Sequence, residues 1–471
     1  MSQILDYLLG QQPAMIQMVE QLVRLESPSA DRSAVNAVAE FLADAFAALG
    51  AQVERLPQVA FGDHLRITWG QGDRQVLFLG HMDTVWPVGE VARRPFQMRE
   101  DPSIGLQKAT GPGTFDMKGG LAIGLYALTA LRDLGLRPAH RLVFLFNSDE
   151  EVGSPTSRPL IEEEAMRSEA VLVLEPSSEN VLFLWRKGVG RFELEIQGVA
   201  SHAGAAHDRG VSAIEELAHQ ILRLEAMTDY GRGTTVNVGV VRGGSKSNVR
   251  PASAWAEIDL RVMTAEEGER MVQAILGLQP VNPKATLIVS GGLNRPPWQI
   301  SPQGEVLFER ARRAGARLGM ELWAGGTGGG SDGNFTAALG IPTLDGLGVV
   351  GGDAHALTEW IDPSSLPRRA ALLAELILDL ARRTRRVVTL EEGILGGGFG
   401  SSVLQLLARA GLRDVGIETV GLPDEFIEHG PRELLLRQFG LDAEGIARRV
   451  AAAFPELGGR PTIKLLEEIA G

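Results

Sequence analysis

Three consecutive carboxylates, Asp149, Glu150 and Glu151, directly follow an apolar run at 142–146 that has the pattern of a buried strand. Open α/β sheets place their ligands at the carboxyl ends of strands, so this stretch is a candidate for chemistry. Because neighbouring side chains of an extended segment point to opposite sides, Glu150 and Glu151 cannot share one role. One of them could bind a metal ion while the other handles protons. Taken alone, however, an acidic loop after a strand is more often a solvated turn.

The sequence places further metal-ligand side chains in comparable positions, at the ends of predicted strands or in loops: His81, Asp83, Asp116, Glu175 and His355. Each has an ordinary explanation by itself, as a surface residue, a satisfied core histidine or a strand end. Together they predict an acidic cluster at one edge of one sheet, and buried unpaired carboxylates require cations nearby. Since the chain has no cysteine, the ligands must be His, Asp and Glu, which favours zinc, manganese or cobalt.

His81 and Asp83 are two positions apart at the end of the predicted strand 76–80. Their side chains therefore lie on the same side of the chain, and the Asp83 carboxylate could accept the second imidazole N–H of His81. Such a contact would fix the tautomer of a metal-bound histidine. An ordinary strand-end pair explains these two residues equally well.

The composition limits the function. A length of 471 residues predicts two or three domains. The formal net charge of -13, with no block of Lys and Arg, argues against a nucleic-acid partner. No apolar run reaches the roughly 20 residues that span a bilayer, and the first residues do not resemble a signal peptide. We therefore expect a cytoplasmic protein without a membrane partner.

Strands alternate with helices from residue 13 to residue 176, an order that predicts an α/β fold with a mainly parallel sheet sandwiched by helices. Residues 187–295 instead follow a β-α-β-β-α-β order, which predicts an inserted ferredoxin-like domain. The predicted domains are the two parts of the catalytic domain, 1–186 and 296–385, the inserted lid or dimerisation domain, 187–295, and a small partial α/β fragment, 386–471. The first predicted helix covers 13–26, with Pro13 near its start.

Several motifs in one order carry a resemblance to a known family: His81-Met82-Asp83-Thr84, Gly111-Pro112-Gly113, Asp116-Met117-Lys118-Gly119-Gly120, Asp149-Glu150-Glu151-Val152-Gly153, Glu175-Pro176, Ser201-His202-Ala203-Gly204 and Gly328-Gly329-Gly330-Ser331-Asp332. Over about residues 10–385 the chain resembles the di-zinc aminoacylase and glutamate carboxypeptidase family, and within it the bacterial glutamate carboxypeptidase branch. One such motif would be weak, whereas the ordered set is specific.

The resemblance implies that Asp116 bridges two zinc ions, for which cobalt or manganese could substitute. His81 and Glu175 would complete one metal site, Glu151 and His355 the other. Glu150 would be the general base as a metal-bridging hydroxide attacks an amide carbonyl, and the implied product is a C-terminal glutamate. The family also implies a cis peptide bond between Asp116 and Met117.

The inserted domain carries further residues to which the resemblance assigns roles. His202 would reach the active site of a partner subunit in a homodimer and stabilise the oxyanion, and Asn248 would contact the substrate. Arg261 would bind the terminal carboxylate of the substrate with its guanidinium fork, although a solvated strand-end arginine is the alternative. Gly329 and Gly330 would allow the backbone to approach the small-molecule or peptide substrate closely.

Residues 386–454 resemble a different protein family, the C-terminal end of deoxyxylulose-phosphate synthase, a transketolase relative. The motifs are Gly396-Gly397-Gly398-Phe399-Gly400 and Gly421-Leu422-Pro423-Asp424-Glu425. The cofactor-binding and catalytic regions of that enzyme are missing, so we expect no thiamine diphosphate and no catalysis by this tail, and we assign no role to His429. Because part of its sheet is missing, the tail should have unpaired strand edges. It would then dock on the peptidase portion, pair with a second copy, or be poorly ordered.

Two alternatives to a glutamate-releasing hydrolase stay open. One is an aminoacylase or deacetylase that acts on non-acidic N-acyl amino acids. The other is a catalytically silent scaffold, which the intact set of ligands argues against. Asp149 has no role that the sequence can assign.

Overall fold

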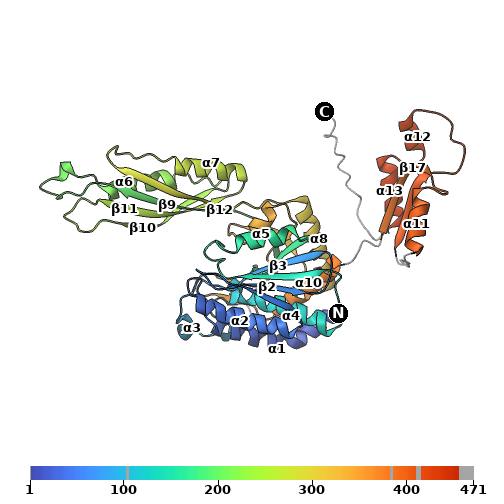
Figure 1. The fold of residues 1–471 in the computed structure, drawn as a ribbon, viewed down its shortest axis with the longest axis horizontal. Helices are drawn as coiled ribbons and strands as arrows, with labels where there is room; N and C mark the ends of the chain where they lie inside the picture. Colours follow the sequence, from blue (N-terminus) through green and yellow to red (C-terminus); the bar gives the residue numbers. More distant parts are fainter. Residues whose placement is uncertain (1, 102–105, 382–385, 410–414, 456–471) are drawn as a thin grey trace. The chain divides into compact units, whose positions relative to one another are not determined.

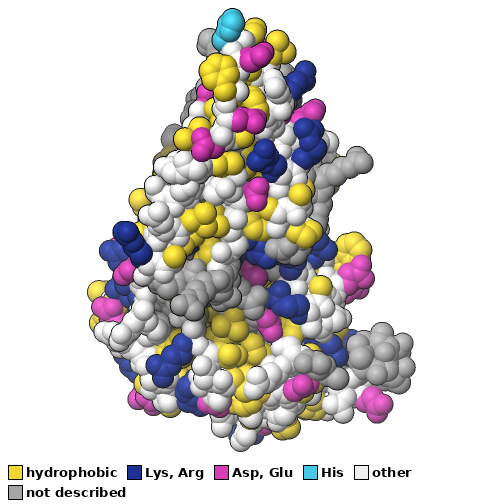
Figure 2. Space-filling model, turned by 90° about the vertical axis from the view of Figure 1, so that its right-hand side faces the viewer, with side chains coloured by type: hydrophobic (Ala, Val, Ile, Leu, Met, Phe, Trp, Pro, Cys, Tyr) yellow, Lys and Arg dark blue, Asp and Glu magenta, His cyan; other side chains and the backbone are white. Residues whose placement is uncertain are grey.

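The structure is a computed structural model that describes residues 2–101, 106–381, 386–409 and 415–455. Its internal contacts divide the chain into two compact units, Met1–Ala381 and Arg382–Gly471. Within the described residues no helix is both long and apolar enough to cross a membrane. On the face shown in Figure 2, basic and acidic side chains are interspersed.

The first unit is built on a mixed sheet of six strands, β1-β2-β6-β3-β7-β14 in spatial order. Four neighbouring strands, β6, β3, β7 and β14, run parallel, and β1 and β2 add an antiparallel edge. The bounds are β1 (Gln52–Leu56), β2 (His64–Trp69), β3 (Gln75–His81), β6 (Arg141–Asn147), β7 (Ala170–Val173) and β14 (Thr343–Leu344). The predicted α/β fold with a mainly parallel sheet is therefore confirmed.

Helices cover both faces of this sheet (Figure 1). One face packs on α1 (Gln3–Arg24), α2 (Arg32–Ala48), α4 (Gly119–Asp133) and α10 (Ser365–Ala381), and the other on α5 (Arg158–Met166) and α9 (Gly333–Ala338). Alternate residues of β3 pack into the cores on the two faces of the sheet. Phe78 packs on the face with α1, α2, α4 and α10, and Leu77 on the face with α5 and α9. Phe78 stacks on Phe144 of β6 with ring centroids 4.3 Å apart. Both faces are buried, which explains why these strands are continuous apolar runs.

The first helix differs from its prediction. It begins at Gln3 rather than near residue 13, so Pro13 lies inside the helix instead of at its start. Ile4, Leu5 and Leu8 are buried and extend the apolar face by two turns. Their burial against the core outweighs the hydrogen bond that a proline inside a helix removes.

The inserted domain has the predicted β-α-β-β-α-β order of elements. Its antiparallel sheet has the spatial order β10-β11-β9-β12 and shares one core with the two helices. The bounds are β9 (Gly188–Gln197), α6 (Ala213–Glu225), β10 (Thr235–Gly243), β11 (Ser253–Val262), α7 (Ala265–Leu276) and β12 (Thr286–Arg295). Strand β9 alternates buried and exposed residues over much of its length, as expected for a sheet with one covered face.

Smaller elements complete the first unit, and the sequence did not indicate most of them. Strand β8 (Val181–Arg186) pairs in parallel with β13 (Trp323–Thr327), and β4 (Gln97–Asp101), β5 (Leu106–Thr110), β15 (Gly351–Gly352) and β16 (Trp360–Ile361) form a separate sheet. Helices α3 (Glu90–Arg93) and α8 (Pro302–Arg317) lie outside the inserted domain. The sequence does not predict β13 and β15 as strands because both contain glycines, which have a low strand propensity.

The second unit is small. It contains a parallel pair of strands, β17 (Arg386–Ile394) and β18 (Gly416–Leu422), with helices α11 (Phe399–Arg409), α12 (Arg432–Gln438) and α13 (Ala443–Ala453).

Candidate metal centre

The sheet brings the predicted ligands to one edge. Strand β3 pairs in parallel with β6, His81 opposite Asn147, and with β7, Leu79 opposite Val173. Because parallel strands end together, the residues that follow β6 and β7 arrive beside His81. The register of β3 with β6 and β7 therefore brings the acidic stretch and Glu175 to His81.

Asp116 lies between the two histidines. Its Oδ1 is 2.9 Å from Nε2 of His81, and its Oδ2 is 3.2 Å from Nε2 of His355. The Asp116–Met117 peptide bond is cis, as predicted. Burial raises the pKa of Asp116, but hydrogen bonds from His355 and His81 outweigh this effect and hold the pKa below its usual range. The two oxygens thus face two different imidazoles, as a bridging carboxylate would.

Glu175 lies next to His81, and Glu151 lies next to His355, so each glutamate joins one of the two histidines at Asp116. Oε1 of Glu175 is 3.5 Å from Nε2 of His81, and Oε2 of Glu151 is 3.3 Å from Nε2 of His355. Burial and repulsion by Asp116 raise the pKa values of both glutamates. Ligand atoms of His81, Asp116 and Glu151 all lie within 4.8 Å of one another, as do those of His81, Glu150 and Glu175.

His355 differs from the other ligands in its exposure. Its side chain is 52% exposed, and it lies in a loop where Asp353 and His355 both have a left-handed backbone with φ of 61°. Hydrogen bonds with Asp116 and Glu151 raise the pKa of His355 to about 10. The site is therefore open to solvent on the side of His355 and closed on the side of His81, which is 1% exposed.

These residues fit a pair of metal ions. Atoms that share a tetrahedral zinc at about 2.0–2.2 Å lie about 3.3 Å apart, close to the separations of 2.9–3.5 Å found here. Oε1 of Glu151 is buried and has no hydrogen-bond partner among the described residues. A buried carboxylate oxygen without a partner is costly, and a cation would satisfy it.

Asp83 lies close to His81 through both its backbone oxygen and its carboxylate. Nδ1 of His81 is 2.9 Å from the backbone oxygen of Asp83 and 3.5 Å from its carboxylate, so the shorter contact is with the carbonyl. The carboxylate also accepts hydrogen bonds from the hydroxyl of Ser29 and from the backbone N–H groups of Glu150 and Glu151. It therefore holds the acidic stretch in place beside His81.

Glu150 is held by an arginine that the sequence did not indicate. Nη2 of Arg295 is 2.7 Å from Oε1 of Glu150, and Nη1 is 2.7 Å from Oδ1 of Asp332. Burial raises the pKa of Glu150 to about 8, against the opposing effects of Arg295 and His81. Arg295 is the last residue of β12, so the inserted domain ends at the candidate general base.

Asp149 also has a structural role. Its carboxylate accepts hydrogen bonds from the backbone N–H groups of Thr156 and Ser157 and from both of their hydroxyls. The fully buried carboxylate thereby closes the loop that follows Glu151. Thr and Ser seven and eight residues after an Asp are only a weak sequence signal for such a loop.

Glu359 is a second residue that sequence reasoning missed. Its carboxylate accepts hydrogen bonds from the backbone N–H groups of Gly113, Phe115 and Asp116 and from the indole of Trp86. Since Glu359 follows His355 by four residues, it connects the segment of one ligand to the turn of another. Burial raises its pKa, against the effect of these hydrogen bonds.

The predicted residues of the inserted domain form a separate group. Within the described chain, no hydrogen bond or ion pair joins His202 or Asn248 to the metal ligands. The two loops lie together, because the N–H of Ala203 donates to the carbonyl of Asn248. Nδ1 of the exposed His202 accepts from the N–H groups of Gly204 and Ala205, so a neutral ring carries its proton on Nε2.

Arg261 and the glycine segment meet at the junction of the two domains. The guanidinium of Arg261 makes a two-pronged contact with Asp259, at 2.8 and 2.9 Å, and its Nη1 reaches the carbonyl of Gly328 at 3.4 Å. A Cβ on Gly330 would lie 2.7 Å from Val189 and 2.8 Å from Arg295, whereas one on Gly329 would meet nothing closer than 3.8 Å. Gly330 thus permits close packing of the domains.

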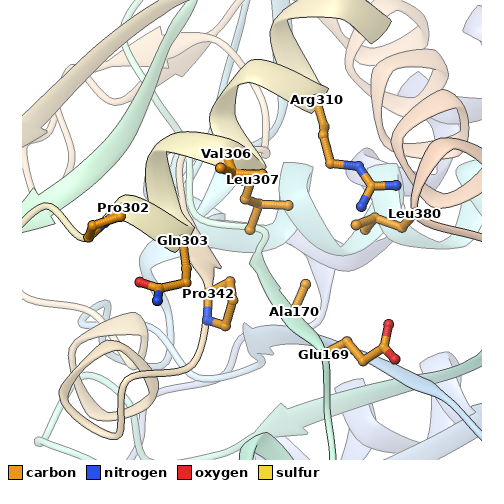
Figure 3. A pocket seen from close by; sticks show the side chains of 9 residues that line it. All are labelled: Glu169, Ala170, Pro302, Gln303, Val306, Leu307, Arg310, Pro342 and Leu380. Atoms are coloured by element: carbon orange, nitrogen blue, oxygen red, sulfur yellow. The ribbon is translucent and has the colours of Figure 1, made fainter. Parts of the chain in front are cut away.

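The pocket in Figure 3 lies elsewhere. It has a volume of about 420 Å³, and Ala170 at the start of β7 lines it, whereas Glu175 follows the other end of that strand. One wall comes from α8, through Pro302, Gln303, Val306, Leu307 and Arg310. The pocket is therefore at the opposite edge of the sheet from the metal ligands.

Comparisons with known proteins give independent evidence on the family of the chain. Residues 77–379 match the model of peptidase family M20/M25/M40. Carboxypeptidase G2 of Pseudomonas sp. (strain RS-16) is 35% identical over 383 residues, which cover 79% of this chain and 90% of that protein. Aminopeptidase PepT of Bacillus cereus aligns with a TM-score of 0.62 at 24% identity, over 79% of this chain and 99% of that chain. The YxeP protein of Bacillus subtilis, described as a dinuclear metal binding peptidase, aligns with a TM-score of 0.56 at 17% identity, over 79% of this chain and 98% of that chain.

The tail has its own match. Residues 366–446 fit the transketolase C-terminal domain. The 1-deoxy-D-xylulose-5-phosphate synthase of Pelotomaculum thermopropionicum is 47% identical over 96 residues, which are 20% of this chain and 15% of that enzyme. Both resemblances seen in the motifs are confirmed. The chain carries a tail that matches the transketolase C-terminal domain, and it belongs to the metallopeptidase family M20/M25/M40.

Proposed function

We propose that this protein is a two-zinc hydrolase that cleaves the amide bond of N-acyl amino acids or peptides and releases a C-terminal amino acid, preferentially glutamate. The observation that carries the proposal is the placement of Asp116, whose two oxygens face His81 and His355 at 2.9 and 3.2 Å. The identity of 35% to a carboxypeptidase supports the reaction class.

The chain's own residues would divide the work as follows. Asp116 would bridge the metals, with His81 and Glu175 on one side and Glu151 and His355 on the other. The bound zinc ions would polarise the scissile carbonyl and acidify a water molecule. Glu150 would accept the proton of that water and pass it to the leaving nitrogen, which requires a carboxylate within hydrogen-bond reach of both. Arg295 would orient Glu150 for these transfers.

The inserted domain would bind the substrate. We infer that His202 donates from Nε2 to the developing oxyanion in the active site of a partner subunit, and that Asn248 on the neighbouring loop contacts the substrate. This arrangement needs a homodimer formed through the inserted domain. The accepting role of Nδ1 of His202 supports it, because the ring then presents a donor outwards.

One observation favours a second candidate, an aminoacylase or deacetylase of non-acidic substrates. The proposed glutamate specificity needs Arg261 to bind a carboxylate of the substrate, yet Asp259 already occupies two donors of its guanidinium. A substrate carboxylate would have to displace or share this contact. The glutamate preference therefore depends on whether Asp259 releases Arg261.

Incubation of the zinc-loaded protein with acyl-glutamate, acyl-ornithine and dipeptide panels tests the proposal. We expect the highest kcat/KM for acyl-glutamate, and a loss mainly in KM when Arg261 is replaced by Lys. Turnover of non-acidic substrates only would overturn the glutamate assignment in favour of the aminoacylase. No turnover of any substrate, with less than one bound zinc per chain, would favour a silent scaffold.

A further inference from the structure

Arg369 of α10 is a buried cation that the proposed mechanism does not use. Its side chain is 1% exposed and is the largest fully buried side chain among the described residues. No described carboxylate forms an ion pair with it, its Nε has no hydrogen-bond partner there, and burial lowers its pKa to about 10. A buried charge without a counter-ion is costly, so its remaining contacts must compensate for that cost.

The guanidinium of Arg369 joins two loops. Nη2 donates to the hydroxyl of Ser177 at 2.8 Å and to the carbonyl of Glu179 at 2.5 Å, and Nη1 donates to the carbonyl of Gly346 at 3.2 Å. The first two acceptors lie in the loop after β7, and the third lies in the loop after β14. Glu179 has a left-handed backbone with φ of 54°, which is uncommon for a residue other than glycine, and the bond to its carbonyl supports this turn.

Both loops hold the backbone of Glu175, a proposed metal ligand. The N–H of Gly348 donates to the carbonyl of Glu175 at 2.9 Å, and the N–H of Ser177 donates to the carbonyl of Val349 at 3.2 Å. A Cβ on Gly348 would lie 2.8 Å from the carbonyl oxygen of Glu175, so the two loops are in close contact. The backbone of Glu175 is thus fixed between two loops, and Arg369 binds both of them.

We propose that Arg369 is a positioning residue, which fixes these two loops so that the carboxylate of Glu175 reaches the metal ion that it would share with His81. This inference rests on the two-metal centre of the proposed function. None of the hydrogen bonds of Arg369 reaches the acidic stretch or the loop of His355. Its effect should therefore fall on the metal at His81 and Glu175 and not on the other metal.

The chemistry of arginine suits this task. Its planar guanidinium presents several N–H donors in a rigid fork, so one group can bind acceptors on two loops at once. A methionine at position 369 would fill a similar space, but it would leave three buried oxygen atoms without this donor. The loops would then lose their link without the addition of a new charge.

Zinc affinity, measured separately for the two sites, tests the proposal. Replacement of His355 by Gln removes a ligand of the other metal, so zinc uptake then reports the site of His81 and Glu175. In this background Arg369→Met should lower the zinc affinity of the full-length chain about 10–100-fold, as for other residues that orient a ligand. In a Glu175→Gln background, which leaves the other site, Arg369→Met should change the affinity by less than about twofold. Competition with a chromophoric zinc chelator measures both affinities.

Arg368→Met is the matched control, because Arg368 is the neighbouring residue on α10 but is exposed. It should leave the zinc affinity unchanged in both backgrounds. Ser177→Ala is a second variant, which keeps the buried cation and removes only one of its three acceptors. It carries the test if Arg369→Met does not fold, and it should lower the affinity of the site at His81 roughly 2–10-fold, as for the loss of one hydrogen bond.

The outcomes separate this proposal from the proposed function. Equal losses in the two backgrounds would show that Arg369 only stabilises the fold, and no loss in the His355→Gln background would also overturn the proposal. Absence of zinc uptake by the unmodified protein would overturn both the positioning role and the proposed function. A loss confined to the site of Glu175, in a protein that hydrolyses no amide, would overturn the proposed function alone.

Discussion

Arg295 holds the carboxylate of Glu150 with Nη2 at 2.7 Å from Oε1, and the same nitrogen lies 3.0 Å from the carbonyl oxygen of Glu150. The guanidinium also binds Asp332, so one side chain that is 4% exposed spans two buried carboxylates. A planar fork can make both contacts at once, whereas an ammonium is a single point of charge.

We therefore expect Arg295→Lys to lower kcat by about 100-fold, because a misplaced general base costs on that order. KM and zinc content should change little. Arg295→Met should also lower the free energy of unfolding, by about 3–5 kcal/mol, since it leaves buried charges unpaired. Arg191→Lys is the control, because this exposed arginine only approaches the carbonyls of Glu151 and Val152. Wild-type kcat in Arg295→Lys would refute the positioning role.

Glu150→Gln should lower kcat by about 10²–10⁴-fold, because a general base contributes on that order and an amide cannot accept the proton. Zinc content, measured by atomic absorption, should stay near that of the unmodified protein. Glu150 also lies within 4.8 Å of ligand atoms of His81 and Glu175. Loss of one zinc per chain in this variant would show that Glu150 is a ligand instead.

Glu359→Gln tests the residue that connects two ligand segments. The carboxylate accepts three backbone N–H groups around Asp116, and an amide would turn a donor towards them. We expect the free energy of unfolding to fall by about 1–3 kcal/mol, and zinc affinity to fall about 10–100-fold. Glu305→Gln on the exposed face of α8 is the control, and equal effects in both variants would count against a specific role.

Metal uptake should release protons. Hydrogen bonds with Asp116 and Glu151 raise the pKa of His355 to about 10, so the metal-free imidazole is protonated at neutral pH. A zinc ligand must be neutral, and metal binding therefore competes with this proton. Zinc affinity should rise as the pH increases towards 10. Calorimetry in buffers of different ionisation enthalpy measures the released protons, and His355→Gln should release fewer. An affinity that does not change with pH would contradict the argument.

Removal of the tail should leave hydrolysis intact. Unit Met1–Ala381 has its own cores and contains every proposed ligand. A chain that ends after residue 385 should keep kcat/KM within about twofold, as for changes that do not touch the site. Light scattering on the same samples reports the oligomeric state. A large loss of kcat/KM in a folded truncated chain would show that the tail supports the active site.

Much of the site could be predicted because its ligands stand at strand ends. The apolar runs before His81, Asp149 and Glu175 determine where the strands lie, and the register of β3 with β6 and β7 then brings the three ends together. The alternation of side chains also predicts that Glu150 and Glu151 differ in role. In the structure Glu151 faces His355 while Glu150 faces Arg295.

Local contacts were predicted less well. The first helix is longer than its pattern indicated, because burial of Ile4, Leu5 and Leu8 outweighs the helix-breaking tendency of Pro13. Asp83 was expected to contact His81 through its carboxylate, which lies 3.5 Å from Nδ1, but the backbone oxygen of Asp83 is closer, at 2.9 Å, and the carboxylate also binds the N–H groups of the acidic stretch. A spacing of two residues along a strand determines that the side chains of His81 and Asp83 lie on the same side. It does not determine which of several nearby donors the Asp83 carboxylate contacts.

The sequence by itself therefore determined the types of ligand, the strand ends that carry them and the family of the chain. Only the tertiary structure decided what supports them: Arg295 on Glu150, Glu359 under Asp116, and Asp149 closing its own loop. The first two contacts join residues more than a hundred positions apart. Their partners depend on how sheets and loops pack in three dimensions, and no periodicity along the chain encodes such packing.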